Sequence, residues 1–286
     1  MNITSIIGVA ASLAFAGSAV ATDTDGDRGI RTVLSNLDIY GAGQAAVSIA
    51  DGESDLDTRL VLGGTYKVDA VAFNLVFQTT DNASEVDVLF GNLAYDTGDF
   101  GTVTFGRFQK VFSAELADTY LGFNYGLTNS AAYNATIGDD VSTDGIGWGA
   151  EYGDLSFELV YGGTDGDLNE ANFSGRAAYD LGFGSVGVGF LEGDVSDSWT
   201  VDFSHGDSFV SYTDVGDEWY GTLFLAQREC IGDLGLYGRA ETGSEFDYEL
   251  AIGATYQLGE NAFIAAEYDY ADTGEDSVNV GIRITF

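Results

Sequence analysis

The chain has 286 residues, of which 45% are hydrophobic, and it contains 40 glycines and no proline. Its 46 Asp and Glu residues outnumber 10 Lys and Arg residues and give a formal net charge of −36, which argues against nucleic acid as a partner. The single cysteine, Cys230, excludes an internal disulfide.

The first 21 residues have the features of a secretory signal peptide. An apolar run from Ile6 to Phe15 is followed by small residues that end in Ala-Val-Ala at positions 19–21, an A-x-A cleavage site. The run is shorter than the ~20 residues that a membrane-spanning helix needs. We therefore expect export of the chain and a single mature domain at residues 22–286.

From residue 37 onward, apolar and polar residues alternate with a period of two over segments of about ten residues. Gly, Asp and Asn separate the segments, and no helical period of comparable length is present. The pattern predicts sixteen β-strands, an even number that puts both chain ends on one side. They begin near Leu37, Asp57, Ala70, Ser84, Gly101, Gly145, Leu155, Ala171, Ser185, Asp197, Asp207, Glu218, Leu234, Phe246, Ala262 and Ser277.

Each predicted strand has one apolar face and one polar face. In residues 246–257, for example, Leu250 and Ile252 share a face with aromatic residues, whereas Glu249 and Thr255 share the other. Sixteen apolar faces turned inward would enclose an interior too wide for side chains to fill. Turned outward, they must meet lipid, where the sheet can have no free edge. The sequence therefore predicts an all-β fold, a 16-stranded antiparallel transmembrane β-barrel.

The last predicted strand alternates up to the final residue. Its apolar positions are Val278, Val280, Ile282, Ile284 and Phe286. A closed barrel requires this strand to pair with the first one, near residues 37–50. We therefore expect Phe286 at a membrane interface and Arg283, on the opposite face, in the lumen.

The few basic residues lie mostly on the polar faces, where they avoid a cost of roughly 2–4 kcal/mol for Arg or Lys at the lipid midplane. Those with lumen parity are Arg59, Lys67, Arg176, Arg228, Arg239 and Arg283. Arg107 instead shares the parity of Val103 and Phe105. We interpret Gly106 as a bulge or strand end that redirects Arg107 into the lumen.

Two segments resemble the general diffusion porins of Gram-negative bacteria, most closely the alphaproteobacterial type. GDFGTVTFGRFQ at residues 98–109 is similar to the strand-turn-strand and arginine signature of that family, and the terminal GIRITF resembles its last strand, which closes on Phe. The resemblance implies a homotrimer of water-filled barrels in the outer membrane. It also implies passage of ions and small hydrophilic solutes, and recognition of the last strand by the barrel assembly machinery.

The resemblance further implies that the third long loop folds into the lumen as a constriction. The matching segment is about residues 110–144; its aromatic content argues against disorder, and it lacks the proline-containing turn of many family members. Its carboxylates are Glu115, Asp118, Asp139, Asp140 and Asp144. Carboxylates facing a wall of arginines would produce a transverse field across the narrowest point. The alternative is a channel lined by ordinary solvated charges without such a field.

Most of the excess negative charge lies in predicted loops such as residues 50–55 and 162–171. Negative potential at the outer mouth would concentrate cations and exclude anions, so we expect a cation preference. No cofactor is expected to be required, although acidic loop oxygens could hold Ca²⁺. Residues 23–27, DTDGD, faintly resemble a calcium loop but are too short and lack the distal Glu.

Three other functions are weaker readings of the sequence. An enzyme is disfavoured because the one histidine, His205, falls in a predicted turn and nothing clusters around it, so no catalytic residue is assigned. A sugar-selective channel would need an aromatic track in the lumen, and only Tyr40 and Tyr237 have the parity for it outside the long loop. A structural or adhesive barrel would not need a long inward loop.

Overall fold

The computed structural model describes residues 36–50, 53–80, 86–109, 142–163, 172–192, 197–259, 261–271 and 276–285. The predicted signal peptide and Phe286 therefore lie outside the described residues. The strands are β1 (Leu37–Ala50), β2 (Glu53–Val68), β3 (Val71–Thr80), β4 (Asp87–Asp96), β5 (Thr102–Gln109), β6 (Ser142–Tyr152), β7 (Leu155–Gly163), β8 (Asn172–Asp180), β9 (Ser185–Leu191), β10 (Ser198–His205), β11 (Ser208–Val215), β12 (Glu218–Ile231), β13 (Leu234–Gly243), β14 (Glu249–Gly259), β15 (Ala262–Ala271) and β16 (Ser277–Thr285), with one 3₁₀ helix, η1 (Gly98–Phe100). Among these residues, no helix has both the length and the apolarity to cross a membrane.

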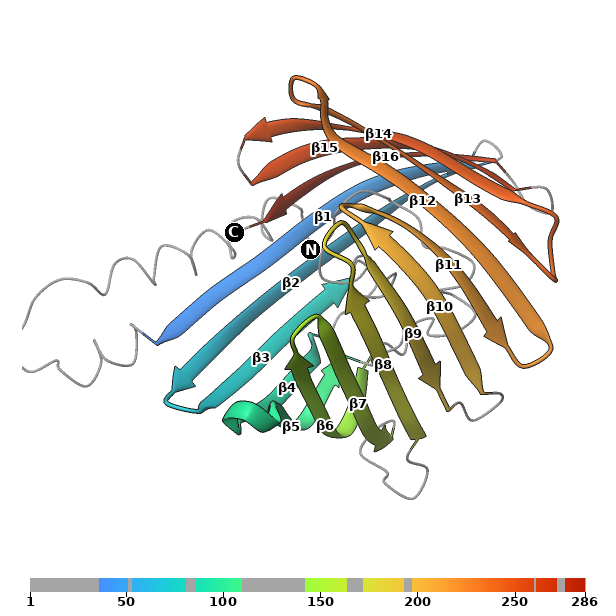
Figure 1. Cartoon of the computed structure of the whole chain (residues 1–286). Coiled ribbons are helices and arrows are strands. Elements are labelled where there is room, and N and C mark those ends of the chain that lie inside the picture. The colour runs from blue at the N-terminus through green and yellow to red at the C-terminus, as the bar shows by residue number, and fades with distance from the viewer. Residues whose placement is uncertain are drawn as a thin grey trace, which may run out of the picture.

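The sixteen strands form one closed antiparallel barrel in which each strand pairs with its neighbours in sequence (Figure 1). β16 pairs with β1, and Val280 lies opposite Val47 while Arg283 lies opposite Gln44. This seam leaves no free sheet edge, as the sequence predicts. The predicted strand count is confirmed, and no predicted start differs from the observed one by more than four residues.

The two faces of the sheet differ as the alternation predicts. On β16, Val278, Val280, Ile282 and Ile284 are exposed on the outside of the barrel, whereas Asn279 and Arg283 between them are buried on the inside. On β14, Ile252 is 68% exposed and its neighbour Ala251 is fully buried. The outer surface is therefore an apolar band, and the polar residues of the strands line the interior.

The two ends of the barrel have different connections. At the end where β1 begins and β16 ends, all seven connections contain five residues or fewer, and they include the two-residue turns at 69–70 and 232–233. Gly232 has φ 62°, a left-handed value that glycine adopts without strain, and Asp69 has φ 52°. The opposite end carries the longer connections, including residues 110–141 between β5 and β6. Short turns at one end and longer loops at the other are typical of outer-membrane barrels.

Aromatic side chains gather near both ends of the apolar band. At the end with the longer loops, the Tyr212 ring lies 5.3 Å from that of Trp199 and 6.1 Å from that of Trp219, between ring centroids. At the end with the short turns, the Phe183 and Phe203 rings lie 6.2 Å apart. Two aromatic belts separated by an aliphatic band match the two interfaces and the core of a bilayer.

Candidate functional site

The candidate site is the inward face of the barrel wall. The structure places Arg59, Arg176, Arg239 and Arg283 on that face, and the chain neighbours of Arg283, Ile282 and Ile284, are exposed on the outside. Lys67 has the same parity but lies at the end of β2 and is exposed beside the turn at 69–70. The backbone of Arg228 belongs to β12, and its side chain is outside the described part of the structure.

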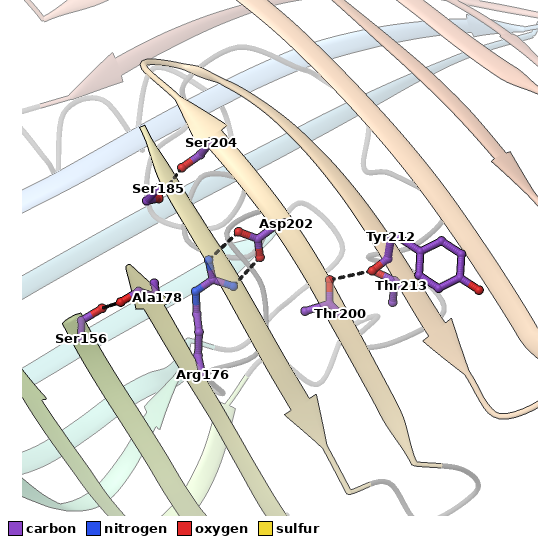
Figure 2. A network of polar contacts seen from close by, with 9 residues as sticks. All are labelled: Ser156, Arg176, Ala178, Ser185, Thr200, Asp202, Ser204, Tyr212 and Thr213. Carbon is purple, nitrogen blue, oxygen red and sulfur yellow. Dashed lines mark hydrogen bonds and ion pairs between the residues drawn. The ribbon is translucent and has the colours of Figure 1, made fainter. Parts of the chain in front are cut away.

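Arg176 on β8 reaches across β9 to Asp202 on β10 (Figure 2). Both terminal guanidinium nitrogens donate to the carboxylate, and the Nη2–Oδ1 distance is 2.6 Å. Asp202 is only 2% exposed, so this two-point pairing replaces most of the contact with water that an exposed carboxylate would have. The reach is possible because Gly187 on β9 has no side chain, and a Cβ there would overlap the guanidinium group.

Three carboxylates lie within 4 Å of Arg239 on β13, and the buried Glu267 on β15 also interacts with it. Arg239 Nε lies 3.2 Å from Glu241, and its Nη2 lies 2.8 Å from Glu249 on β14 and 3.6 Å from Asp269 on β15. Thr222 on β12 donates a 3.0 Å hydrogen bond to Glu241. Arg239 and Glu241 are 7% and 4% exposed. This arginine therefore acts as an internal counterion that holds carboxylates of three strands together.

Arg59 and Arg283 meet neutral acceptors near the seam of the barrel. Arg59 Nε and Nη2 donate to Gln78 Oε1 at 3.0 and 2.7 Å. Arg283 Nε donates to Gln44 Oε1 at 2.9 Å, and its guanidinium carbon lies 5.8 Å from the centre of the Phe263 ring. Amide oxygens orient a guanidinium without cancelling its charge. Arg283 also interacts with the buried carboxylate of Glu267.

Arg107 pairs with Asp144, its direct neighbour on β6, with Nε–Oδ1 and Nη2–Oδ2 distances of 2.9 and 2.7 Å. The assignment of Asp144 to the loop is wrong, because β6 starts at Ser142 and Asp144 is a strand residue. Gly106 has φ 118°, yet the pairing of β5 with β4 and β6 shows no register shift, so the predicted bulge is not an inserted residue. The lumen position of Arg107 stays a prediction.

An aromatic cluster also lies on the inward face. Phe209 on β11 stacks on Phe224 on β12 with ring centroids 5.4 Å apart, and Tyr237 on β13 follows at 6.2 Å. Phe209 and Tyr237 are nearly fully buried, and Tyr237 lies over Gly253 of β14. The rings cover one another and the wall, so they leave little free aromatic surface for a solute.

The remaining site predictions fall outside the described residues. They are the loop carboxylates Glu115, Asp118, Asp139 and Asp140 and the calcium loop at residues 23–27. Within the described segments, no group of three or more His, Cys, Asp or Glu side chains is arranged to hold a metal ion. His205 is the last residue of β10, and its Nδ1 contacts the carbonyl oxygen of Phe183 in a neighbouring turn.

Sequence reasoning missed the carboxylates that pair with the arginines, namely Asp202, Glu241 and Asp269, and it placed Glu249 on a polar face without a partner. From alternation alone, all four carboxylates are expected on the same face of the sheet as the arginines that point into the lumen. Which of them meet depends on the register between strands, which periodicity does not contain.

No protein-family model matches the chain, and no curated protein matches its sequence. Solved structures do match. A multiply substituted mutant of Rhodopseudomonas blastica porin is 16% identical with a TM-score of 0.68 and covers 87% of this chain and 100% of its own. A Vibrio cholerae outer membrane protein, OmpT with loop L8 deleted, is 16% identical with a TM-score of 0.62 and covers 87% of this chain and 99% of its own. At these identities the similarity is one of fold: the chain has the barrel of the Gram-negative general porins.

Proposed function

From this porin-type barrel we propose that the chain is an outer-membrane porin, a channel for passive diffusion of ions and small hydrophilic solutes. The observation that carries the proposal is the closed sixteen-strand sheet with an apolar outer band and a charged inner face. A soluble protein would gain nothing from exposing so continuous a band. The proposal includes export by the segment 1–21, insertion by the barrel assembly machinery and assembly as a homotrimer in the outer membrane of a Gram-negative bacterium.

The proposed channel prefers cations and is not an enzyme. The net charge of −36 and the pairing of Arg176 and Arg239 with wall carboxylates support the cation preference, because paired arginines attract anions less. No catalytic constellation accompanies His205 among the described residues.

A substrate-specific channel for a sugar or another small solute is the second candidate, and the aromatic cluster Phe209–Phe224–Tyr237 is the observation in its favour. The burial of Phe209 and Tyr237 weighs against it, because a sugar needs an open ring face on which to stack.

Single-channel recording in planar bilayers tests the proposal. We expect stepwise ohmic conductance and, in a KCl gradient, a reversal potential of the sign that cation preference gives. Conductance blocked by one class of sugar would favour the specific channel. Absence of conductance from folded, detergent-purified protein would refute a pore.

A further inference from the structure

Five oxygen-bearing side chains form a continuous row across the inner wall. Each is paired directly with the next in the strand register, from β10 to β14. The row runs through Asp202, Ser211, Thr222, Glu241 and Glu249. Directly opposed residues on neighbouring strands have Cβ atoms about 5 Å apart, so the row is continuous along the wall. Because barrel strands tilt by about 35–45°, the row runs obliquely to the barrel axis.

The carboxylates of this row and Asp269, which shares Arg239 with them, form what we call the acidic arc: Asp202, Glu241, Glu249 and Asp269. Two counterions, Arg176 and Arg239, contact the arc. Four carboxylates and two guanidinium groups leave a net charge of −2 (−4 and +2). The buried Glu267 on β15, which also interacts with Arg239, adds to this negative charge, so the wall predicted to be basic is negative along the arc.

Some oxygens along the arc lack protein donors. Ser211, 5% exposed, lies between Asp202 and Thr222, and no hydrogen-bond partner for its hydroxyl is present among the described residues. In the same part of the chain, Asp269 Oδ1 also has no such partner. Buried oxygens without donors indicate a place that water or a cation completes.

The arc is also open to solutes at one side. The side chains of Glu249 and Asp269 keep 20% and 16% of their surface exposed, whereas those of Glu241 and Asp202 are almost fully enclosed. Enclosed charges are screened less by salt than exposed ones, so their field extends to the accessible pair.

We propose that the acidic arc, rather than the charge of the outer loops, sets the cation preference of the pore through the negative potential that it creates in the lumen. The inference rests on the proposed pore function, and it assigns the ion selectivity of the pore to the four carboxylates of the acidic arc. Partial rings of carboxylates lining a channel act in this way by raising the local cation concentration and repelling anions. Arg239 is a positioning residue that holds three of the carboxylates close together.

The test compares two double variants by reversal potential in a KCl gradient. Glu249→Gln with Asp269→Asn removes two charges from the arc. The matched control, Glu245→Gln with Asp247→Asn, removes two exposed charges from the connection between β13 and β14. We expect the arc variant to move the reversal potential much closer to zero than the control does. An equal or larger shift in the control would overturn the inference.

The outcomes separate this inference from the proposed function. A native protein without conductance would refute the pore itself. If the native protein conducts and the double variant of the acidic arc keeps the same cation preference, only the role of the acidic arc is refuted. If the double variant does not fold, Glu249→Gln alone is the fallback, because the amide oxygen can still accept from Arg239 while one charge is lost. An unchanged reversal potential in that folded single variant contradicts the inference.

Discussion

At the scale of single residues, the wall depends on glycines that let long side chains cross a strand. Arg176 passes over Gly187 to reach Asp202, a carboxylate with almost no contact with solvent. Burying a charge without its partner is unfavourable. The ion pair therefore requires a glycine at position 187, because any side chain there would occupy the space of the guanidinium group.

Gly187→Ala should therefore displace the Arg176 guanidinium and destabilise the barrel by about 1–3 kcal/mol, the cost of leaving a buried polar group unpaired. Urea unfolding of the protein in lipid vesicles measures the change. Gly149→Ala is the control, because a Cβ there meets its nearest neighbours at an ordinary 3.8 Å. Equal stability of the two variants would contradict this account.

Arg59 is the arginine whose removal should most directly change conduction. Its guanidinium is fixed to Gln78 on the inward face, so Arg59→Ala removes both bulk and positive charge from the wall. We expect a larger single-channel conductance and a stronger cation preference. Lys67→Ala removes the same charge at the exposed end of β2 and should change both less. A reversal potential unaffected by Arg59→Ala would place this residue away from the narrow part of the pore.

At the scale of elements, each strand has to match the bilayer on one face and the lumen on the other. β14 shows this requirement clearly, since Ile252 projects outward near the middle of the strand and Leu258 projects outward next to the short turn. Lipid penalises a charge most at the midplane and little at the interface.

Ile252→Arg should lower the free energy of unfolding by about 2–4 kcal/mol, whereas Leu258→Arg should cost about 0–1 kcal/mol. Reversible unfolding in vesicles compares the two variants. Similar penalties at both positions would show that the apolar band does not lie in hydrocarbon.

Much at the level of elements follows from periodicity. The sixteen strands and the outward positions of Val278, Val280, Ile282 and Ile284 are confirmed, because alternation reports directly which side chains face lipid. The assignment of Asp144 is wrong because Gly145 looks like a strand start, although the pairing with β5 already begins at Ser142.

At the scale of the whole molecule, the net charge of −36 is large, but salt determines how far it acts. The Debye length is about 10 Å at 0.1 M and about 3 Å at 1 M ionic strength. If wall and mouth charges select cations through the solution in the lumen, selectivity must weaken as salt rises.

We expect the cation preference to fall when a KCl gradient of fixed ratio is moved from about 0.1 M to about 1 M, since screening shortens the field. The reversal potential at each mean concentration measures this dependence. A preference independent of salt would indicate selection by direct, dehydrated contact instead of a field across water.

The number of strands, the side of each strand that meets lipid and the inward position of Arg59, Arg176, Arg239 and Arg283 all follow from the sequence alone. These features depend on the period of two, which is a local property of the chain. The contact of Arg176 with Asp202 across β9 and the contacts of Arg239 with carboxylates of three strands are seen only in the folded protein. Such contacts depend on the stagger between strands and on glycines that leave room beneath a side chain, and neither quantity is contained in the alternation of any one segment.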